Sequence, residues 1–285
     1  FPIRIHRLHS PDRYRHLSES VSKRIHQSSS FIYYCRDFVI GQPYWKKNGA
    51  RLEAMLAAKS DIVLTNSTQF AIRFKQYNLN TFPVETGVNL ELYDVRQKWE
   101  VPEDLKHIPS PIIGYVGSVI ALRLDCDLLM EVAQSRPQYN FVFIGPEDET
   151  FSNHPLHRLP NAYFLGKKRV ETLPAYITGC DICINPQIVN DITDGNYPLK
   201  IDEYLAMGKP IVATSTHTMR DIFAEYAYLP ANAEEYLQAL DAALKECGDK
   251  NKEEQRIVSP IHIVGNIASR KYIILSNSFK PSNMV

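Results

Sequence analysis

Short apolar runs alternate with amphipathic stretches along most of this 285-residue chain, and this alternation restricts its fold more than any other feature. Short apolar runs bounded by turn residues are typical of strands buried on both faces of a parallel sheet. The stretches between them have the spacing of helices that cross over such a sheet and cover it. The sequence therefore predicts an α/β protein built from parallel strands and crossover helices.

Two series of strands are expected, separated by a polar, proline-containing stretch at residues 101–111. The first series lies at 31–35, 61–66 and 82–85, with helices near 43–58 and 67–77, the second of which Ser67 is placed to cap. The second series lies at 112–117, 140–144, 162–165, 181–185, 210–214 and 227–229. Three strands are few for a Rossmann-like domain, so the first domain is either small or lacks its beginning.

These patterns predict a partial N-terminal domain over residues 1–105, a nearly complete Rossmann-like domain over 106–250 and an atypical tail over 251–285. From Arg256 onward the 3.6-residue period is lost, so we expect no closing helix there. Shifting the reading frame of a back-translated 261–275 yields a helix-like sequence, and we hypothesise that the tail is a frameshifted reading. Charged residues at 13–24 are expected to form the solvated face of a helix.

Composition excludes several classes of function. Lys plus Arg and Asp plus Glu are equal at 32 each, so no overall field attracts nucleic acid, and we expect no polynucleotide partner. No apolar run approaches the roughly 20 residues that cross a bilayer, and the start has no signal-peptide core, which favours a cytoplasmic chain. Five scattered cysteines do not suggest a disulfide framework.

The most informative stretch runs from Thr193 to Thr214 and reads TDGNYPLKIDEYLAMGKPIVAT. Pro198 suits a first helical turn, Gly208 suits a C-terminal cap and Pro210 prevents continuation, which predicts a helix over 198–207 followed by a strand. The turn at Gly195, Asn196 and Tyr197 would then present backbone N–H groups at the start of a helix near the carboxyl edge of the sheet. Phosphates bind at such places in doubly wound folds.

Lys200 and Glu203 lie one turn apart on this helix, so they share a face that can reach one ligand. The alternative is an ordinary capped helix with a Lys–Glu pair on its surface. The residues alone leave both interpretations open.

The same stretch resembles the donor-binding segment of the retaining, family-four glycosyltransferases, which have the GT-B fold of two Rossmann-like domains. There a Glu, seven residues and a second Glu precede the phrase Ala-x-Gly-x-Pro, and Glu203 matches the second Glu. The resemblance implies that Glu203 accepts hydrogen bonds from the ribose of the nucleotide. The first Glu falls on Gly195, and the adjacent Asp194 is the candidate to replace it. The sequence of this stretch is similar to that of a subgroup associated with bacterial surface polysaccharide assembly.

Further motifs match the family in order, and together the resemblance spans about residues 31–246. The strand and turn that end in Gly117 and Ser118 are followed by Arg123, which falls on a diphosphate-binding Lys of the family. Ser118 replaces a second cation, and Lys200 is the candidate to supply that charge. The loop after the strand at 162–165 borders the nucleobase in the family, which places Gly166 and Lys167 there.

The resemblance implies a transferase that moves a sugar from a nucleotide-diphosphate donor to an acceptor hydroxyl, with retention of configuration. The donor is a co-substrate, and no metal or other cofactor is expected. The acceptor would be a sugar or a lipid-linked glycan, with peripheral association at the inner face of the membrane. The expected catalytic residues are Arg123, Lys200 and Asp194. The expected donor-binding residues are Gly117, Ser118, Gly166, Lys167, Gly195, Asn196, Tyr197, Pro198 and Glu203.

Two other functions remain open: a noncatalytic nucleotide-sugar-binding fragment, favoured by Gly195 at the first Glu position, and a GT-B-fold nucleotide-sugar epimerase. Two metal-like patterns are rejected. Cys180 and Cys183 have ligand spacing but enter a buried strand, where residues three apart face opposite ways, so we expect core cysteines. His154 and His157 lie in a loop without a third ligand nearby and are expected at the surface.

Overall fold

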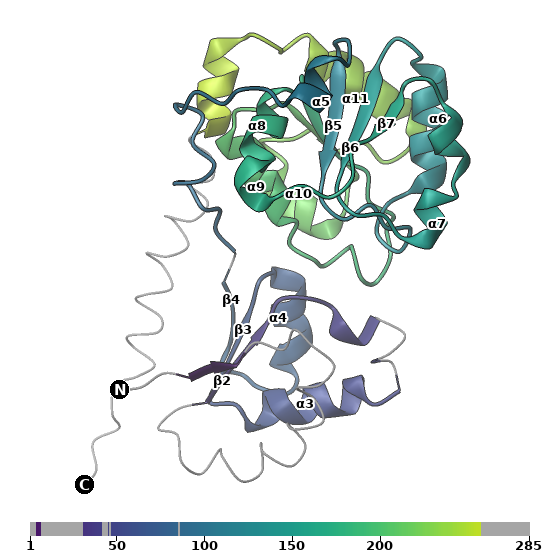
Figure 1. Cartoon of the computed structure of the whole chain (residues 1–285). Helices are drawn as coiled ribbons and strands as arrows, with labels where there is room; N and C mark the ends of the chain where they lie inside the picture. Colours follow the sequence, from purple (N-terminus) through teal and green to yellow (C-terminus); the bar gives the residue numbers. More distant parts are fainter. Residues whose placement is uncertain (1–3, 7–30, 42–44, 46, 85, 258–285) are drawn as a thin grey trace, which may run out of the picture. The chain divides into compact units, whose positions relative to one another are not determined.

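The computed structural model describes residues 4–6, 31–41, 45, 47–84 and 86–257, which fold into two compact units (Figure 1). The first unit comprises Phe1–Thr86 with Asp194–Tyr197, and the second comprises Gly87–Thr193 with Pro198–Val285. This division falls earlier than the expected boundary near residue 105. Each unit is described below by itself.

The first unit contains a four-stranded parallel sheet in the order β1-β2-β3-β4. The strands are β1 (Arg4–His6), β2 (Phe31–Cys35), β3 (Ile62–Thr65) and β4 (Thr81–Pro83), and η2 (Val39–Gly41), α3 (Gly49–Lys59) and α4 (Thr68–Lys75) accompany them. Strands β2 to β4 were expected, whereas the three residues of β1 are too few to give a pattern. The Ser67 cap is confirmed, because its side chain accepts a hydrogen bond from the Phe70 N–H.

The second unit contains a five-stranded parallel sheet in the order β7-β6-β5-β8-β9. Its strands are β5 (Ile112–Val116), β6 (Asn140–Ile144), β7 (Ala162–Phe164), β8 (Ile182–Asn185) and β9 (Ile211–Ala213). All five match predicted strands within a residue or two. The strand expected at 227–229 is reduced to a bridge between Val212 and Tyr228, so that prediction was wrong.

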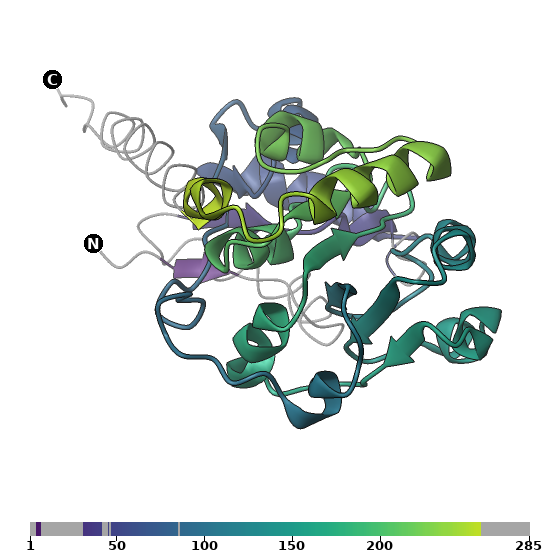
Figure 2. The same ribbon diagram turned by 90° about the horizontal axis from the view of Figure 1, so that it is seen from above.

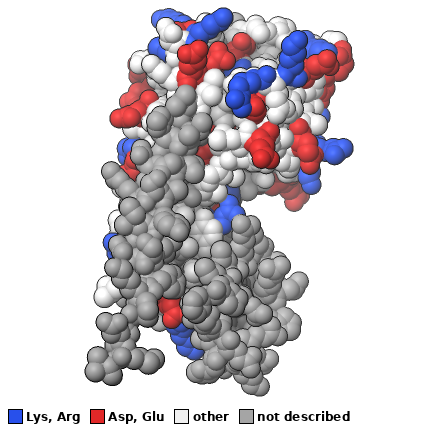
Figure 3. Space-filling view, turned by 90° about the vertical axis from the view of Figure 1, so that its left-hand side faces the viewer, with Lys and Arg blue, Asp and Glu red and all other residues white. Residues whose placement is uncertain are grey.

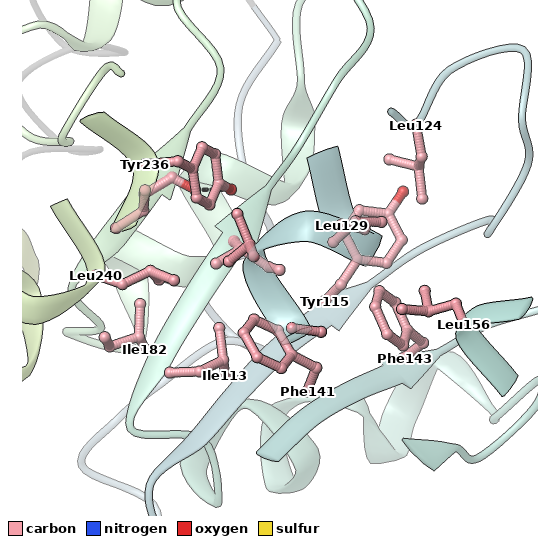
Figure 4. Packing of buried hydrophobic residues seen from close by; sticks show 14 of the residues in the cluster. Ile113, Tyr115, Leu124, Leu129, Phe141, Phe143, Leu156, Ile182, Tyr236 and Leu240 are labelled. Carbon is pink, nitrogen blue, oxygen red and sulfur yellow. Dashed lines mark hydrogen bonds between the residues drawn. The ribbon is translucent and has the colours of Figure 1, made fainter. Parts of the chain in front are cut away.

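Helices cover both faces of this sheet (Figures 1 and 2). The helical segments are α5 (Glu103–Lys106), α6 (Cys126–Ser135), α7 (Glu149–Ser152), η3 (Pro155–Arg158), η4 (Val170–Thr172), α8 (Leu173–Thr178), α9 (Leu199–Ala206), α10 (His217–Phe223) and α11 (Ala233–Leu244). Residues 250–257 are also helical. The α6 and α11 helices share one core with alternate residues of β5, β6 and β8, which Figure 4 shows for Ile113, Phe141 and Ile182.

The segment before β5 packs on the second unit, which explains where the two units divide. Leu105 is fully buried, and a Cβ atom added at Gly179 would lie 2.5 Å from its Cδ2 atom. Asp104 accepts hydrogen bonds from the Tyr176 hydroxyl at 2.9 Å and from Lys168 Nζ at 2.6 Å. Polar composition suggested a domain boundary here, but the contacts of Leu105 and Asp104 fix the segment to the second unit.

Two sequence predictions fall wholly or mostly outside the described residues. The charged stretch at 13–24 is one of them. Of the expected irregular tail from Arg256 onward, the structure describes only Arg256 and Ile257, and both are helical. Within the described part of the chain, no helix has the length and apolar character needed to cross a membrane.

Candidate functional site

The candidate site lies at the carboxyl ends of β5 and β8, where the two strands separate. Their pairing joins Ile113 to Ile182 and Gly114 to Cys183. The strand order reverses between β5 and β8, since the chain continues outward from β5 through β6 and then returns to β8 on the other side. In doubly wound folds ligands bind in the crevice at such a switch point.

Tyr204 on α9 fixes this helix to the end of β5. Its hydroxyl accepts a hydrogen bond from the Val116 N–H at 2.8 Å and donates to the Val116 carbonyl at 3.3 Å, and its side chain is fully buried. The β5–β8 pairing includes only Ile113 and Gly114, and the tyrosine provides the partner for both backbone polar groups of Val116. Helix α9 is therefore held beside the turn that follows β5.

Gly117 begins that turn in the left-handed region, with φ of 142°. Its N–H donates to the Ile144 carbonyl at 2.9 Å, which ties the turn after β5 to the end of β6. A Cβ atom at Gly145 would lie 1.8 Å from the Gly117 carbonyl oxygen. Both glycines are needed because their two turns are in direct backbone contact.

Lys200 on α9 reaches over the Gly117 turn. Its Nζ atom donates to the Tyr115 hydroxyl and lies 3.7 Å from the centroid of the Tyr115 ring, and the Tyr115 hydroxyl in turn donates to the Ser118 carbonyl at 3.0 Å. A Cβ atom at Gly117 would lie 2.7 Å from Nζ. The amine is thus held directly against the backbone of the turn.

Burial lowers the pKa of Lys200 to about 7, Glu203 opposes this shift and Arg123 adds to it. An amine with such a pKa is only partly charged at neutral pH, and a bound anion would favour its charged form. The arrangement can therefore supply a cation to an anionic ligand at the switch point.

Glu203 lies one turn further along α9. Burial raises the pKa of this carboxyl group, while the neighbouring Tyr93 hydroxyl and the Lys200 amine act in the opposite direction. Lys200 and Glu203 are both half-buried, and neither takes part in an ion pair with another described residue. The interpretation of an exposed Lys–Glu pair is therefore wrong.

Arg123 lies in a loop that is joined to the loop after β8. Its carbonyl accepts from the Ile188 N–H at 3.0 Å, Leu124 bridges to Gln187, and Asp125 caps α6 through the Leu128 N–H. The guanidinium is half-buried and is close enough to lower the pKa of Lys200. The structure thus brings Arg123, Lys200 and Glu203 to one side of the second unit.

The other predicted donor-binding residues of this unit lie around the same edge. Ser118 is exposed in the turn, Pro198 is buried at the start of α9, and Lys167 is exposed beyond β7. Gly166 adopts φ of 68° with no atom within 4 Å of an added Cβ, so its surroundings are open. Their roles toward a ligand stay predictions.

Asp194, Gly195, Asn196 and Tyr197 belong to the first unit, where the Asn196 side chain accepts from the Phe38 N–H at 3.3 Å. Helix α9 begins at Leu199, with Pro198 at the capping position and Met207 and Gly208 at its end, close to the predicted 198–207. A phosphate cradle at 195–197 therefore stays a prediction.

Sequence reasoning missed three tyrosines: Tyr93, Tyr115 and Tyr204. A tyrosine inside an apolar strand or helix needs a partner for its hydroxyl, and this signal could have identified Tyr115 and Tyr204. Tyr93 lies in an irregular segment without a pattern. Only the tertiary structure brings it to Glu203.

Among the residues that the structure describes, no three His, Cys, Asp or Glu side chains are grouped as they would be to hold an ion. Cys180 and Cys183 are buried, as expected. The stated reason was wrong, because Cys180 precedes β8 and its thiol neighbours that of Cys183. His154 caps η3, and His157 pairs with Glu147 at the surface.

Charge on the visible face of the second unit is mixed, with acidic and basic side chains intermingled (Figure 3). This agrees with the formal net charge of zero. Attraction of an anion to the switch point would therefore come from Lys200 and Arg123 themselves.

Comparison with known proteins shows which family the second unit is similar to. Residues 110–246 match the family model described as glycosyl transferases group 1. A Bacillus subtilis (strain 168) protein assigned to teichuronic acid biosynthesis as the glycosyltransferase TuaH is 28% identical over 178 residues, which cover 61% of this chain and 45% of that protein. The chain thus spans less than half the length of this curated relative.

Solved structures share the fold. The Anabaena protein Alr3699/HepE in complex with UDP aligns with a TM-score of 0.64 and 18% identity, covering 85% of this chain and 71% of that one. Sucrose-phosphate synthase from Thermosynechococcus elongatus aligns with the same TM-score and identity over 92% and 72% of the two chains. The chain has the GT-B fold, and its residues 110–246 are similar to the glycosyl transferases of group 1.

Proposed function

We propose that this chain is the nucleotide-sugar-binding part of a glycosyltransferase that transfers a sugar from a nucleotide-diphosphate donor to an acceptor hydroxyl. One observation carries the proposal: Lys200 and Glu203 are held on one face of α9, beside the Gly117 turn, at the switch point between β5 and β8. A cation and an acceptor-only carboxylate one helical turn apart match the diphosphate and ribose of a nucleotide.

Each group has a separate task in this proposal. Glu203 accepts hydrogen bonds from the ribose hydroxyls. Lys200 and Arg123 stabilise the charge on the departing diphosphate, with the N–H groups of 195–197 as further donors. A preorganised donor of this kind typically lowers the barrier by about 2.7 to 4 kcal/mol. Gly166 and Lys167 border the nucleobase, and Asp194 replaces the missing first Glu toward the transferred sugar.

The proposed reaction proceeds with retention and without a metal ion, since the two cations take the role that a divalent ion has elsewhere. The acceptor is a sugar or a lipid-linked glycan, in the biosynthesis of a cell-surface polysaccharide or glycoconjugate. The relation to a teichuronic acid glycosyltransferase supports this choice. UDP is the first nucleotide to test, because it is bound in the Alr3699/HepE structure.

The decisive experiment is product analysis with radiolabelled UDP-sugars and an acceptor glycan, in the presence and absence of a chelator. Sugar transferred with retained configuration, unaffected by chelator, supports the proposal. An absolute metal requirement contradicts the metal-free site, and an epimerised sugar without transfer contradicts the reaction. Calorimetry with UDP, ADP and GDP shows separately whether the second unit binds a nucleotide.

The second candidate is a noncatalytic nucleotide-sugar-binding chain. Gly195 favours it, since this position carries a carboxylate toward the sugar in the family that the chain resembles. Binding of UDP with no turnover of any UDP-sugar would select this candidate. Restoring turnover with Gly195→Glu would show that the missing carboxylate is the cause.

A further inference from the structure

The segment that precedes β5 delivers one buried hydroxyl to the proposed nucleotide site. The Asn89 side chain accepts hydrogen bonds from the N–H groups of Glu91 and Leu92, and its carbonyl accepts from the Tyr93 N–H at 2.9 Å. Tyr93 is the last residue of this hydrogen-bonded turn, and its side chain is buried, with only 4% exposed. Asn89 thus has a structural role in placing Tyr93.

The Tyr93 hydroxyl is buried, and among the described residues no group meets hydrogen-bond geometry with it. A buried hydroxyl without a partner is costly, so such a group needs an explanation. Glu203 is the charged neighbour of this hydroxyl, since the two side chains shift each other's ionisation. The hydroxyl therefore lies beside the carboxylate that is assigned to ribose.

We propose that Tyr93 is a positioning residue, whose hydroxyl donates to the Glu203 carboxylate and holds it ionised and oriented for the ribose hydroxyls. This inference rests on the proposed function. Glu203 has two oxygens and can accept from Tyr93 while the ribose occupies its remaining acceptor sites. A phenylalanine would fill the same space but leave the half-buried carboxylate with one donor fewer.

The pH dependence follows from the groups around Glu203. Lys200 and Tyr204 face it from α9, Tyr93 faces it from the segment before β5, and Arg123 acts on Lys200. Removal of the Tyr93 hydroxyl takes away one of the influences that lower the pKa of Glu203. The carboxylate form then becomes less favourable in the folded protein, whereas the protonated form is little affected. The effect should appear above the pKa of Glu203 and fade below it.

The first experiment needs no nucleotide. The thermal unfolding midpoints of the whole chain and of Tyr93→Phe are compared at pH 8 and pH 5, each also in a Glu203→Gln background. We expect a larger loss for Tyr93→Phe at pH 8 than at pH 5, and no such pH dependence in the Gln background. An equal loss at both pH values, or the same pH dependence in the Gln background, would overturn the proposal.

The second experiment measures UDP binding by calorimetry. Tyr93→Phe should weaken UDP about tenfold at pH 8, as expected for the loss of a hydrogen bond to a charged group, and less at pH 5. An unchanged affinity, or the same loss at both pH values, would overturn the positioning role. If the unaltered chain binds no nucleoside diphosphate, the proposed function fails, while the first experiment still decides the Tyr93–Glu203 contact.

Tyr236→Phe is the matched control in both experiments. Tyr236 is a buried tyrosine on α11 whose hydroxyl donates to the Val212 carbonyl at 3.1 Å, away from the switch point. Its removal should lower the unfolding midpoint equally at pH 5 and pH 8 and leave UDP affinity unchanged. A pH-dependent loss in this control as well would show that the Tyr93 result is not specific and would overturn the proposal.

Discussion

Glu53 in the first unit and Glu203 in the second are carboxylates whose surroundings differ in opposite ways. In the first unit, Glu53 is fully buried and both of its oxygens have partners: the Tyr33 hydroxyl donates to Oε1 at 2.8 Å, and Arg73 forms an ion pair with Oε2. In the second unit, Glu203 is half-buried and has no ion-pair partner among the described residues.

The difference separates a structural charge from one that is available to a ligand. The Arg73 guanidinium also lies 4.9 Å from the ring centroids of Phe38 and Phe74, so the ion pair is part of the packing of α4. Burial raises the pKa of Glu203, which means that the folded protein loses stability by keeping this group ionised. Such a cost is expected at a binding site, where a ligand supplies the missing partners.

Arg73→Met should have the largest effect on stability. It leaves the Glu53 carboxylate buried without a cation, a change that typically costs about 3 to 5 kcal/mol. Because the Arg73 side chain is 22% exposed, the lower end of this range is expected. Chemical denaturation monitored in the first unit gives the value. Adding Glu53→Gln should recover part of the loss, and no recovery would contradict the structural role of the pair.

Glu203→Gln should give the opposite result. The free energy of unfolding at pH 8 should stay the same or increase, because a charge that burial disfavours is removed. Affinity for UDP should fall at least tenfold, since a hydrogen bond to a charged group is worth about 1.5 to 3 kcal/mol. Denaturation and calorimetry on the same preparation measure both. Unchanged UDP affinity would remove Glu203 from the nucleotide site.

The pKa of Lys200 predicts a pH profile for binding. Burial holds it at about 7, so the charged form that favours a diphosphate is lost as the pH rises through 7. Affinity for UDP should therefore fall between pH 6 and pH 9, by up to about tenfold per pH unit above 7. Lys200→Arg keeps its charge over this range and should flatten the profile. A profile that is equally steep in Lys200→Arg would assign the titration to another group.

The same shift predicts the effect of Lys200 on stability. The pKa of Lys200 is lower in the folded protein than in the unfolded chain. Below pH 7 the amine is charged in both states, so the free-energy penalty for burying its charge is present in full. The penalty is relieved as the pH rises toward the unfolded pKa of about 10.4. Lys200→Met should raise the unfolding free energy at pH 6 by on the order of 2 kcal/mol, after allowance for partial exposure. The gain should shrink at pH 10, and a loss at pH 6 would contradict this account.

Arg123→Ala should have the smallest effect, because Arg123 is only half-buried in a loop and Lys200 still supplies a cation. UDP affinity should fall a few-fold while uridine affinity stays unchanged, since a cation at a phosphate acts on the charged part of the ligand. Calorimetry with both ligands decides this. Equal losses for UDP and uridine would indicate that Arg123 only maintains the loop between β5 and α6.

The sequence predicted the elements of the second unit well, because each has a local signal. Strands β5 to β9 are apolar runs between turn residues, and α9 is bounded by Pro198 and Gly208, whose backbone preferences act within a few residues. Lys200 and Glu203 could be identified as a pair for the same reason, since the helical period alone puts them on one face.

The predictions failed where a contact is distant along the chain. The strand at 227–229 had a suitable composition but only one bridge to β9. The stretch before β5 was expected to hold the domain boundary, yet Leu105 packs beside Gly179 and Asp104 binds Tyr176. Cys180 and Cys183 were expected on opposite faces, which assumes that both lie within the strand.

By itself, the sequence determined the α/β class, the order of the strands of the second unit along the chain and the face shared by Lys200 and Glu203. Secondary-structure propensity, hydrophobic period and turn chemistry depend on neighbouring residues and can therefore be predicted from the sequence. Only the tertiary structure decided the surroundings of that face: Tyr115 under the amine, Tyr204 on the end of β5 and Tyr93 beside the carboxylate. Burial and low polarity, which shift the two ionisations, arise only when segments more than 80 residues apart, such as those of Tyr115 and Lys200, are brought into contact.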